Sequence, residues 1–380
     1  MRFGSTSGLF ALLRACASVL CLGLAAPAAG FGAVAAVQDD RLAVLPMDQI
    51  ESRLDMIAAT GAKVTRVDLF WSDVAPTRPT FMDDPNDPAY LWDRYDQIFI
   101  GLKARKITPI VAVYNGPTWA TGGKQRTSVE GLNAQAPNPG FFGRFMGVVA
   151  KRYSGRVSSP FLGVLPRVRN YEIWNEPNLI RYHFPQYKGG KSVSLKAYVL
   201  LVKNAYPRIK KANPTAVVIA GSAGPKSKSD SKGLGSRAWL QGIVKSKVKF
   251  DAYAQHIYPA APPKGKTKAF PTWRSIPEIL TTLDGLRKNI PLYITEAGYT
   301  TATTPFRTVK VAPKAQASFL TQIFGLKDVK QKRVPVVVWF NMQDNPNWPG
   351  GLVRQNGTKK PSYAAFRKVA VRSKLPAALR

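Results

Sequence analysis

The apolar residues of this chain follow two different spacings in turn. Short runs rich in Val, Ile and Ala alternate with longer stretches in which apolar residues recur every three or four positions. In one such stretch Met47, Ile50, Leu54 and Ile57 fall on one helical face, and Gly61 stands just past its end. The short runs predict β-strands, and the longer stretches predict amphipathic helices.

Eight strands and eight helices are predicted, and they alternate along the chain. The strands are expected at residues 33–37, 64–69, 108–113, 168–173, 216–221, 252–256, 291–295 and 334–340. The helices are expected at residues 47–60, 93–104, 139–153, 193–212, 237–245, 275–288, 313–329 and 361–372. Near-continuous apolar runs, such as residues 336–340, are typical of parallel strands that are buried on both faces. The pattern therefore predicts an α/β protein with one domain, a (β/α)8 TIM barrel.

A doubly wound α/β sheet is the alternative architecture for strands and helices that alternate. Proteins that bind nucleotides on that fold carry a glycine-rich phosphate loop after a strand. No predicted strand of this chain is followed by such a loop. The barrel is therefore the preferred prediction.

The chain begins with a segment of different composition. Two arginines precede an uncharged stretch at residues 15–37, whose apolar centre at 17–24 is followed by Ala-Pro-Ala at 26–28. This layout is typical of a secretory signal peptide. We expect a signal peptide at residues 1–28, a mature domain at residues 29–380, and a secreted protein that is extracellular, periplasmic or held at the cell surface. An uncleaved membrane anchor is the alternative, because the uncharged stretch is long enough to span a bilayer.

Composition narrows the class of protein. Apolar residues make up 45% of the 380 residues, which is enough for a large core and too many for a disordered chain. Cys16 and Cys21 both lie inside the predicted signal peptide, so the mature domain has no cysteine for a disulfide or a metal. With two histidines in the whole chain, a histidine-rich metal centre is not expected.

The chain has a large excess of basic residues, and its formal net charge is +33. Residues 36–100 hold 6 basic and 12 acidic side chains, whereas residues 181–250 hold 15 basic and 1 acidic. An excess of this size suggests a polyanionic partner. By the predicted helices, much of the excess lies outside the barrel, so it is equally consistent with a solvated surface.

Two glutamates stand at the ends of predicted strands, where a barrel of this kind carries its active site. Glu176 follows the fourth strand within Trp-Asn-Glu-Pro, and Glu296 follows the seventh within Thr-Glu-Ala-Gly. Cleavage of a glycosidic bond needs such a pair, one carboxyl protonated to assist the leaving group and one ionised to attack or to activate water. An isolated glutamate after a strand more often stabilises a helix start. The surrounding motif, in which Asn175 is placed to bind a sugar hydroxyl, favours the catalytic interpretation.

Together the two motifs resemble those of clan A of the retaining glycoside hydrolases, and the similarity is greatest to bacterial proteins of families 39 and 5. The resemblance extends over about residues 33–370, nearly the whole mature chain. It implies that Glu176 is the acid/base and Glu296 the nucleophile of a double displacement. Such a reaction needs no metal and no organic cofactor.

Further positions match the pattern of this clan. Arg66, on the second strand, is implied to hydrogen-bond the nucleophile and to lower its pKa. His256 and Tyr258, after the sixth strand, are implied to line the site, and Trp339, on the eighth, is implied to stack under the sugar. One departure is Tyr-Asn at residues 114–115, where family 5 members commonly have a histidine. It weighs against family 5 and against cellulose as the substrate.

Other residues near strand ends are given lesser roles. Glu172 is expected to be structural or supporting, and Asp68 is expected to cap a helix or to support the catalytic residues. His183 is as consistent with a plain loop residue as with a sugar contact. Trp348 is one candidate platform for a sugar ring.

These features predict a secreted retaining glycoside hydrolase that cleaves O-glycosidic bonds, expected to be β, in a poly- or oligosaccharide. The expected partner is the carbohydrate substrate, with an acidic polysaccharide or the cell envelope as further candidates. Nucleic acid is not expected as a partner, and the chain is expected to be a monomer without stable membrane insertion once the signal is cleaved. The alternative is a non-catalytic cationic envelope protein that binds an anionic glycan or another polyanion.

Overall fold

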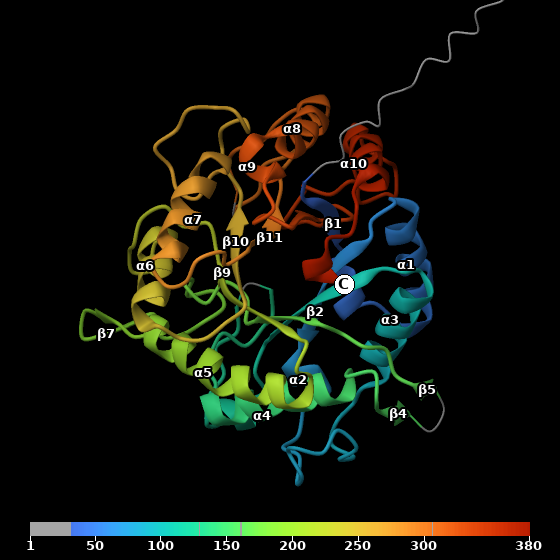
Figure 1. Cartoon of the computed structure of the whole chain (residues 1–380), viewed down its shortest axis with the longest axis vertical. Helices are drawn as coiled ribbons and strands as arrows, with labels where there is room; N and C mark the ends of the chain where they lie inside the picture. The colour runs from blue at the N-terminus through green and yellow to red at the C-terminus, as the bar shows by residue number, and fades with distance from the viewer. Residues whose placement is uncertain (1–31, 129, 160–161, 306) are drawn as a thin grey trace, which may run out of the picture. The chain divides into compact units, whose positions relative to one another are not determined.

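The computed structural model describes residues 32–380, except residues 129, 160, 161 and 306. The predicted signal peptide and both cysteines lie outside the described residues. Eight parallel strands close into a barrel in the order β1-β12-β11-β10-β9-β6-β3-β2, and helices surround it (Figure 1). The predicted (β/α)8 TIM barrel is confirmed.

Each barrel strand is followed by at least one helix before the next barrel strand. The barrel strands are β1 (Val34–Gln38), β2 (Val64–Phe70), β3 (Thr108–Tyr114), β6 (Asn170–Ile173), β9 (Val217–Ala223), β10 (Ala252–Ile257), β11 (Leu292–Ala297) and β12 (Val336–Phe340). The main helices are α1 (Ile50–Ala59), α3 (Asp93–Ala104), α4 (Pro139–Arg152), α5 (Ser194–Ala212), α6 (Ser236–Ser246), α7 (Ile276–Asp284), α8 (Pro313–Gly325) and α10 (Pro361–Arg372). Shorter elements are α2 (Trp71–Val74), α9 (Lys327–Lys330) and the 3-10 turns η1 (Asp40–Ala43), η2 (Met47–Gln49), η3 (Thr118–Thr121), η4 (Trp273–Ser275) and η5 (Ala377–Leu379).

The predicted strands and helices are confirmed apart from shifts of a few residues at their ends. One predicted helix, at residues 313–329, is instead two, because Leu326 takes the extended backbone angles φ −67° and ψ 137° between α8 and α9. The helix predicted from residue 47 begins as the 3-10 turn η2 and becomes α-helical at Ile50.

Two short hairpins are additions to the predicted pattern. They are β4 (Ser158–Ser159) with β5 (Gly163–Val164), and β7 (Tyr187–Lys188) with β8 (Lys191–Ser192). The second hairpin turns at Gly189 and Gly190, whose φ angles are 54° and 73°. A two-residue Gly-Gly turn is a hairpin signal in the sequence, but strands of two residues are too short to show an alternating pattern.

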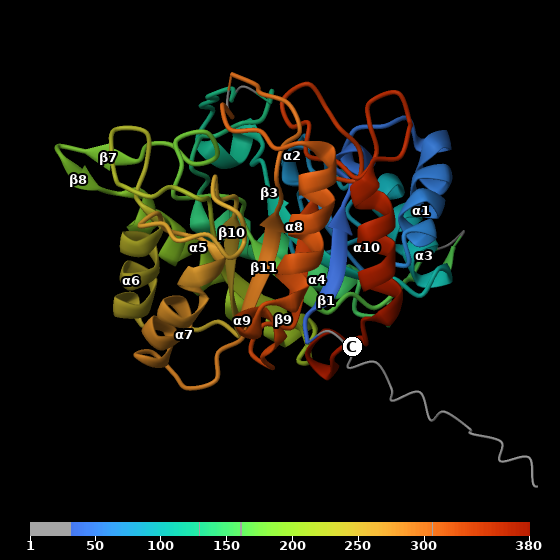
Figure 2. The same ribbon diagram turned by 90° about the horizontal axis from the view of Figure 1, so that it is seen from above.

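The core has two layers, one inside the barrel and one between the barrel and the helices. The inner layer is formed by small and β-branched side chains such as Val34, Ala36 and Val64. Leu379, in η5 near the C-terminus, packs against this inner layer and is fully buried. Figure 2 shows β11 pointing away from the end of the barrel that carries the C-terminus and toward the end that carries β7 and β8.

Alternation along each strand decides which side chains reach the barrel axis. On β12, Val336 and Val338 belong to the inner layer, while Val337 and Trp339 pack in the outer layer. The same alternation gives Phe340, the last residue of the strand, the inward direction. The inner residues at the carboxyl ends of the strands are therefore the ones that can form a site.

Strand β11 departs from this alternation at the position of the predicted nucleophile. Its register against β12 pairs Ile294 with Val337 and then Ala297 with Trp339, so β11 has one extra residue. A β-bulge of this kind re-aims side chains next to functional sites. Here it allows two successive side chains, Thr295 and Glu296, to bond to groups inside the barrel.

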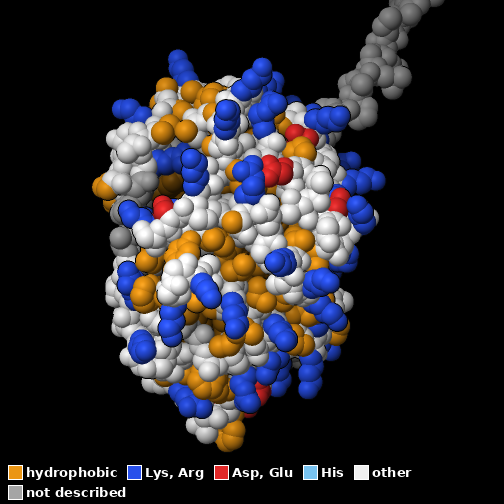
Figure 3. Space-filling view, turned by 90° about the vertical axis from the view of Figure 1, so that its left-hand side faces the viewer, with side chains coloured by type: hydrophobic (Ala, Val, Ile, Leu, Met, Phe, Trp, Pro, Cys, Tyr) orange, Lys and Arg blue, Asp and Glu red, His pale blue; other side chains and the backbone are white. Residues whose placement is uncertain are grey.

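The excess of basic residues lies on the outside of the barrel, as expected. On α5, Lys196, Lys203 and Lys211 are exposed. Figure 3 shows the side on which α6 and α7 lie in Figure 1, with many Lys and Arg side chains and few Asp and Glu. Among the described residues, no helix combines the length and the apolar character that crossing a bilayer requires.

Candidate active site

A single buried arginine organises the mouth of the barrel. Arg66, on β2, has no exposed surface. Its guanidinium donates to Glu172 Oε2 (2.6 Å), Gln38 Oε1 (2.8 Å), Glu296 Oε1 (2.9 Å), Asn175 Oδ1 (2.9 Å) and Asp68 Oδ1 (3.1 Å). These acceptors come from β1, β2, β6, β11 and the turn after β6, so one side chain ties together strands from opposite sides of the barrel.

The charge of Arg66 is secured by the carboxylates around it. Burial by itself would lower the pKa of Arg66, but Glu172, Asp68 and Glu296 outweigh that effect and raise the pKa above its ordinary value. Glu172 is also fully buried and accepts a second hydrogen bond, from Thr295 Oγ1 at 2.8 Å. Glu172 therefore has the supporting role expected of it, as a fully buried counter-ion of Arg66.

Glu296 is held on both of its oxygens. Oε1 accepts from Arg66, and Oε2 accepts from the hydroxyl of Tyr258 at 2.7 Å. Burial raises the pKa of Glu296 to about 7, against the opposing effects of His256 and Arg66. The Arg66 contact implied by the resemblance is present, and it lowers the pKa as expected, but desolvation is the larger effect.

Glu176 sits in a turn with unusual backbone angles. Trp174 and Glu176 both have positive φ, 64° and 41°, in the left-handed region that side chains other than glycine rarely adopt. The Glu176 amide donates to Ser222 O at 2.9 Å, which fixes the turn against the end of β9. The turn allows Asn175 and Glu176, which are neighbours in the sequence, to take different places in the same mouth. Strain of this kind is often found at functional sites.

His256 lies between the two glutamates. Its Nδ1 is 2.8 Å from Glu176 Oε1 and 3.3 Å from Glu296 Oε2. Burial would lower the pKa of His256, but the two carboxylates outweigh burial and raise it. The two carboxylates therefore favour the charged form of the ring, which lies inside the barrel mouth where the resemblance implies a site residue.

The two glutamates are close enough to act on one atom. A carboxyl oxygen of Glu176, one of Glu296 and a ring nitrogen of His256 all lie within 4.8 Å of one another. These three groups could also ligate a cation. However, Glu296 already bonds to Arg66 and Tyr258, and a cation would lie beside the Arg66 charge. The donor set therefore suits proton transfer and nucleophilic attack better than metal binding.

The expectation that Trp339 stacks under a sugar is wrong. Trp339 is 1% exposed, packs in the outer core layer and donates from Nε1 to Gly350 O at 3.0 Å. The alternation of β12 turns it toward the helices. Its neighbour Phe340 is half-buried at the mouth instead.

An aromatic wall stands beside Glu296. The rings of Tyr258 and Trp348 meet edge to face with centroids 4.6 Å apart, and Phe340 lies 5.8 Å from Trp348. Trp348 is half-buried, so it stays a candidate sugar platform. Arg307 places its guanidinium 5.8 Å from the Trp348 ring and donates to the carbonyl of Tyr258 at 2.8 Å, which fixes this wall in place.

Two further polar residues belong to the site: Asp68, which was expected to cap a helix or to support the catalytic residues, and Gln38, for which no role was expected. Gln38 accepts from Arg66 and donates to Asp68 Oδ2 at 2.8 Å. Asp68 is a support of this network, and burial raises its pKa to about 6. Both share the alternation of inward residues on their strands, Gln38 with Val34 and Asp68 with Val64, and this is the signal that could have found Gln38.

Two asparagines at strand ends have different roles. Asn175 is 4% exposed and accepts from Arg66 through Oδ1, which leaves Nδ2 free to donate to a ligand hydroxyl. Asn115 stands where family 5 commonly has a histidine. It instead holds two loops, donating to Ser72 Oγ at 2.8 Å and accepting from Asn133 N at 2.8 Å.

Comparisons with known proteins agree with this geometry. Residues 43–345 match the Cellulase family (glycosyl hydrolase family 5). No curated protein matches the chain.

Similar solved structures include a family 39 glycoside hydrolase from the gut symbiont Bacteroides cellulosilyticus WH2, with a TM-score of 0.61, 20% identity, 89% of this chain covered and 63% of that one. A GH39 β-xylosidase from Caulobacter crescentus has a TM-score of 0.61, 18% identity and coverage of 89% and 72%. GH5_18 from Streptomyces cattleya, in complex with GlcNAc, has a TM-score of 0.61, 13% identity and coverage of 92% and 82%. The chain thus spans just under two thirds of the first of these proteins. At identities this low, the similarity shows that the three proteins have the same fold as this chain.

The barrel and its paired carboxylates match the architecture of the glycoside hydrolase clan that the sequence resembles. Within that class, the chain belongs to the Cellulase family, glycosyl hydrolase family 5. The prediction from Tyr114 and Asn115 that the chain lies outside family 5 is therefore wrong.

His183 lies near this site but is not part of it. Its ring has no exposed surface and stands edge-on to Trp174, with centroids 6.1 Å apart. Neither ring nitrogen has a hydrogen-bond partner among the described residues. A sugar contact is therefore ruled out in this structure, and burial lowers the pKa of His183 to about 4.

This burial predicts a loss of stability in acid. Between pH 6.5 and 4 the unfolded chain binds a proton on His183 that the folded chain does not, so the free energy of unfolding falls as the pH falls, by roughly 3 kcal/mol in all. The His183→Phe variant keeps the ring contact and removes the titration. Denaturant unfolding of both proteins from pH 8 to 4 should show a shallower pH dependence for the variant. Parallel curves would contradict the prediction.

Proposed function

We propose that this glycosidase is a retaining enzyme that acts by double displacement, with Glu296 as nucleophile and Glu176 as acid/base. The observation that carries the proposal is the short separation of the two carboxyl groups, whose nearest oxygens lie within 4.8 Å. Retaining enzymes hold their carboxyl groups about 5–5.5 Å apart, and inverting enzymes hold them about 6.5–9.5 Å apart to admit a water.

The contacts of each glutamate fit its role. Glu296, ionised and oriented by Arg66 and Tyr258, attacks the anomeric carbon and displaces the leaving oxygen. Glu176 gives its proton to that oxygen, and the His256 Nδ1 at 2.8 Å keeps its carboxyl oriented. In the second step the ionised Glu176 takes a proton from water, which attacks the same carbon and releases Glu296.

The substrate we propose is a β-linked poly- or oligosaccharide that is met outside the cytoplasm. Support comes from the names of the family, Cellulase, and of a structural neighbour, a β-xylosidase, and from the predicted signal peptide. The half-buried aromatic wall of Tyr258, Phe340 and Trp348 offers faces for the apolar side of a sugar ring.

The first prediction separates the two glutamates. Glu296→Gln should abolish turnover of every substrate, because no nucleophile remains. Glu176→Gln should slow substrates with poor leaving groups about 10²–10⁴-fold, since general acid catalysis is lost, and should spare substrates with very good leaving groups. Steady-state rates on an aryl glycoside series check both, and NMR of the first-released anomer checks retention. An unaltered rate in Glu296→Gln would refute the assignment.

The second prediction concerns pH. Glu296 attacks only when ionised, and its pKa is raised to about 7 by burial, so kcat/KM should rise with pH through about 7. Tyr258→Phe removes a hydrogen bond that favours the ionised form, and the acid limb should then move up by about 1 pH unit. The pH profiles of the two proteins test this. A limb that moves down, or does not move, would count against Glu296 as the titrating group.

A second function, binding of an anionic polymer, is favoured by one feature at the opposite end of the barrel. A cavity of about 840 Å³ lies where β3 and β6 begin and where η5 ends. Its basic lining residues are Lys103, Lys106, Arg156, Arg167, Arg169 and Arg380. No Asp or Glu is among the lining residues that the structure describes. Converging cations of this kind attract polyanions.

The matched test reverses two charges at each of two places. Lys106→Glu with Arg167→Glu should weaken binding of polygalacturonate at low salt by about tenfold, which is about 1.4 kcal/mol. Lys196→Glu with Lys203→Glu makes the same change in net charge on α5 and should weaken binding much less. Calorimetry at 50 and 500 mM NaCl provides both affinities and their salt dependence. Equal losses in the two double variants would assign the effect to overall charge.

A further inference from the structure

The two ends of the barrel differ in charge. The segments that lead from a main helix into the next barrel strand lie at the end opposite the mouth, and the C-terminal segment lies there too (Figure 2). These segments are residues 60–63, 105–107, 153–169 without 160 and 161, 213–216, 247–251, 285–291, 326–335 and 373–380, and we call the surface that they form the basal face. It holds 16 basic and 2 acidic side chains, whereas the segments from each barrel strand to the next main helix hold 19 basic and 11 acidic. Acidic side chains thus offset much of the basic charge at the mouth and almost none of it at the basal face.

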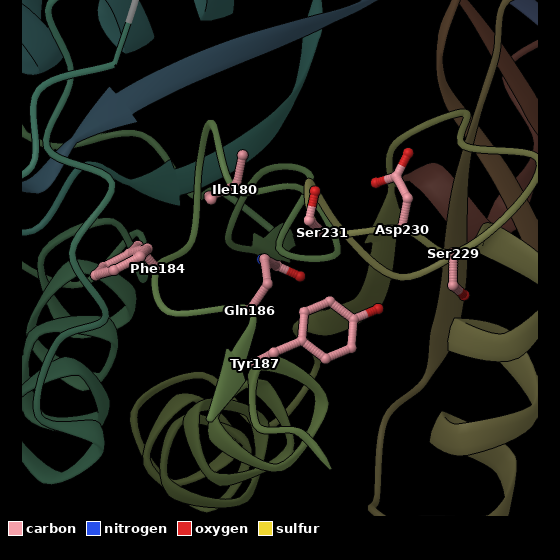
Figure 4. A pocket seen from close by; sticks show the side chains of 7 residues that line it. All are labelled: Ile180, Phe184, Gln186, Tyr187, Ser229, Asp230 and Ser231. Carbon is pink, nitrogen blue, oxygen red and sulfur yellow. The ribbon is translucent and has the colours of Figure 1, made fainter. Parts of the chain in front are cut away.

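The cavities at the two ends show the same contrast. The basic cavity described above belongs to the basal face, and its lining includes six Lys and Arg residues. A cavity of about 470 Å³ at the mouth lies between the loops that follow β6 and β9. Figure 4 shows its lining side chains, which include Asp230, with no Lys or Arg among those that the structure describes. The cations are therefore gathered at the basal face and do not line every hollow of the surface.

Most cations of the basal face are exposed, and they are spread around the whole barrel. Of the 16 basic side chains, 12 are exposed, and these come from six of the eight segments. Arg167 precedes β6 and Lys332 precedes β12, and these two strands stand opposite each other in the barrel. One of the two acids, Asp251, is paired with Lys210 at 2.8 Å. A linear polymer in the basic cavity would reach the cations on one side only, whereas a flat anionic surface can approach the cations on all sides.

Exposed apolar side chains adjoin these cations. Leu162 and Val164, in the hairpin of β4 and β5, are 50% and 58% exposed, and Val164 lines the basic cavity together with Arg167. Val371, in the last turn of α10, is also exposed and lies against Gly61 of the basal face. Apolar side chains beside Lys and Arg are typical of surfaces that lie on membranes, because the cations meet anionic headgroups while the apolar groups reach the acyl boundary.

The preceding part of the chain joins the domain at the same end. Strand β1 begins at Val34, and Gly32 packs against Lys330 of the basal face so closely that a Cβ there would be 2.0 Å from Lys330 O. The 31 residues before Gly32 include an uncharged stretch at residues 15–31, where the sequence predicts a signal peptide or, as the alternative, a membrane anchor. An anchor at these residues would hold the basal face toward the bilayer.

We propose that the basal face docks on a bilayer that contains anionic phospholipids. Its cations attract the lipid phosphates, and Leu162 and Val164 add apolar contact at the headgroup boundary. The proposal goes beyond the polymer binding proposed for the basic cavity, because it uses cations all around the barrel, and it does not depend on the catalytic mechanism. With the basal face on the bilayer, the mouth that holds Glu176 and Glu296 points away from the membrane.

The test measures how the domain of residues 29–380, which contains the whole closed barrel and its core, partitions onto lipid vesicles. Vesicles of phosphatidylcholine alone are compared with vesicles that contain about one third phosphatidylglycerol. Sedimentation in about 50 mM NaCl should give a partition coefficient at least about tenfold higher on the anionic vesicles, and about 500 mM NaCl should remove the difference by screening.

Two double variants locate the contact on the basal face. Lys106→Glu with Arg167→Glu reverses two charges in the basic cavity, and Lys249→Glu with Lys332→Glu reverses two exposed charges outside it, before β10 and β12. Each pair should lower the partition coefficient on anionic vesicles at least about tenfold, because a flat surface meets both places. Denaturant unfolding of each variant checks that it is folded.

Two further pairs serve as matched comparisons. Lys264→Glu with Lys266→Glu makes the same change in net charge on the exposed loop after β10, at the mouth, and should leave vesicle binding within about twofold of wild type. Leu162→Ser with Val164→Ser keeps the charge and removes the apolar contact. It should weaken vesicle binding about fivefold and leave the affinity for polygalacturonate within about twofold of wild type.

Three results would overturn the proposal. The first is equal binding to neutral and anionic vesicles, and the second is an equal loss in the basal and mouth variants. The third is a loss confined to the variant in the basic cavity, which would reduce the contact to that cavity. Binding of polygalacturonate without binding of vesicles would also refute membrane docking, and it would leave the polymer site of the cavity standing.

Discussion

The site depends on one constraint, the burial of the Arg66 guanidinium at the mouth of the barrel. A buried cation must be matched by acceptors, and those of Arg66 come from four of the eight strands and from the turn that carries Asn175. Removing one partner of a buried ion pair costs about 3–5 kcal/mol, because the other is left unpaired. The same bonds that stabilise the barrel therefore fix the orientation of Glu296.

The electrostatics of the mouth oppose those of the rest of the protein. The chain carries +33, yet Asp68, Glu172, Glu176 and Glu296 converge on a single arginine and a single histidine. Burial raises the pKa of Glu296 and the charge of Glu176 adds to that rise, while His256, Arg66 and Tyr258 limit it. The Glu296 carboxyl is thus poised near neutral pH by desolvation and by its neighbours together.

Much of this site could be predicted from sequence, for a physical reason. Strand ends of a closed barrel meet at one mouth, so Glu176 and Glu296 could be placed together from their positions alone. Alternation also carries the signal for Phe340 over Trp339, because Val336 and Val338 are the inward residues of β12. The bulge in β11 carries no such signal, since an extra residue in one strand shows only against the register of its partner.

The loops are the part of the structure that the sequence predicts least well. The barrel is shared with proteins only 13–20% identical, so the strands are compatible with many side chains. The contact between the loops that follow β6 and β9, by contrast, needs Gly233 for a close backbone approach to Asn178, and the hairpin of β7 and β8 turns at Gly189 and Gly190. The residues that hold these loops against each other follow neither the helical nor the strand spacing. The hydrogen bonds of Arg66 lie at the ends of the barrel strands instead. Substrate choice can therefore change in this fold while the bonds of Arg66 stay the same.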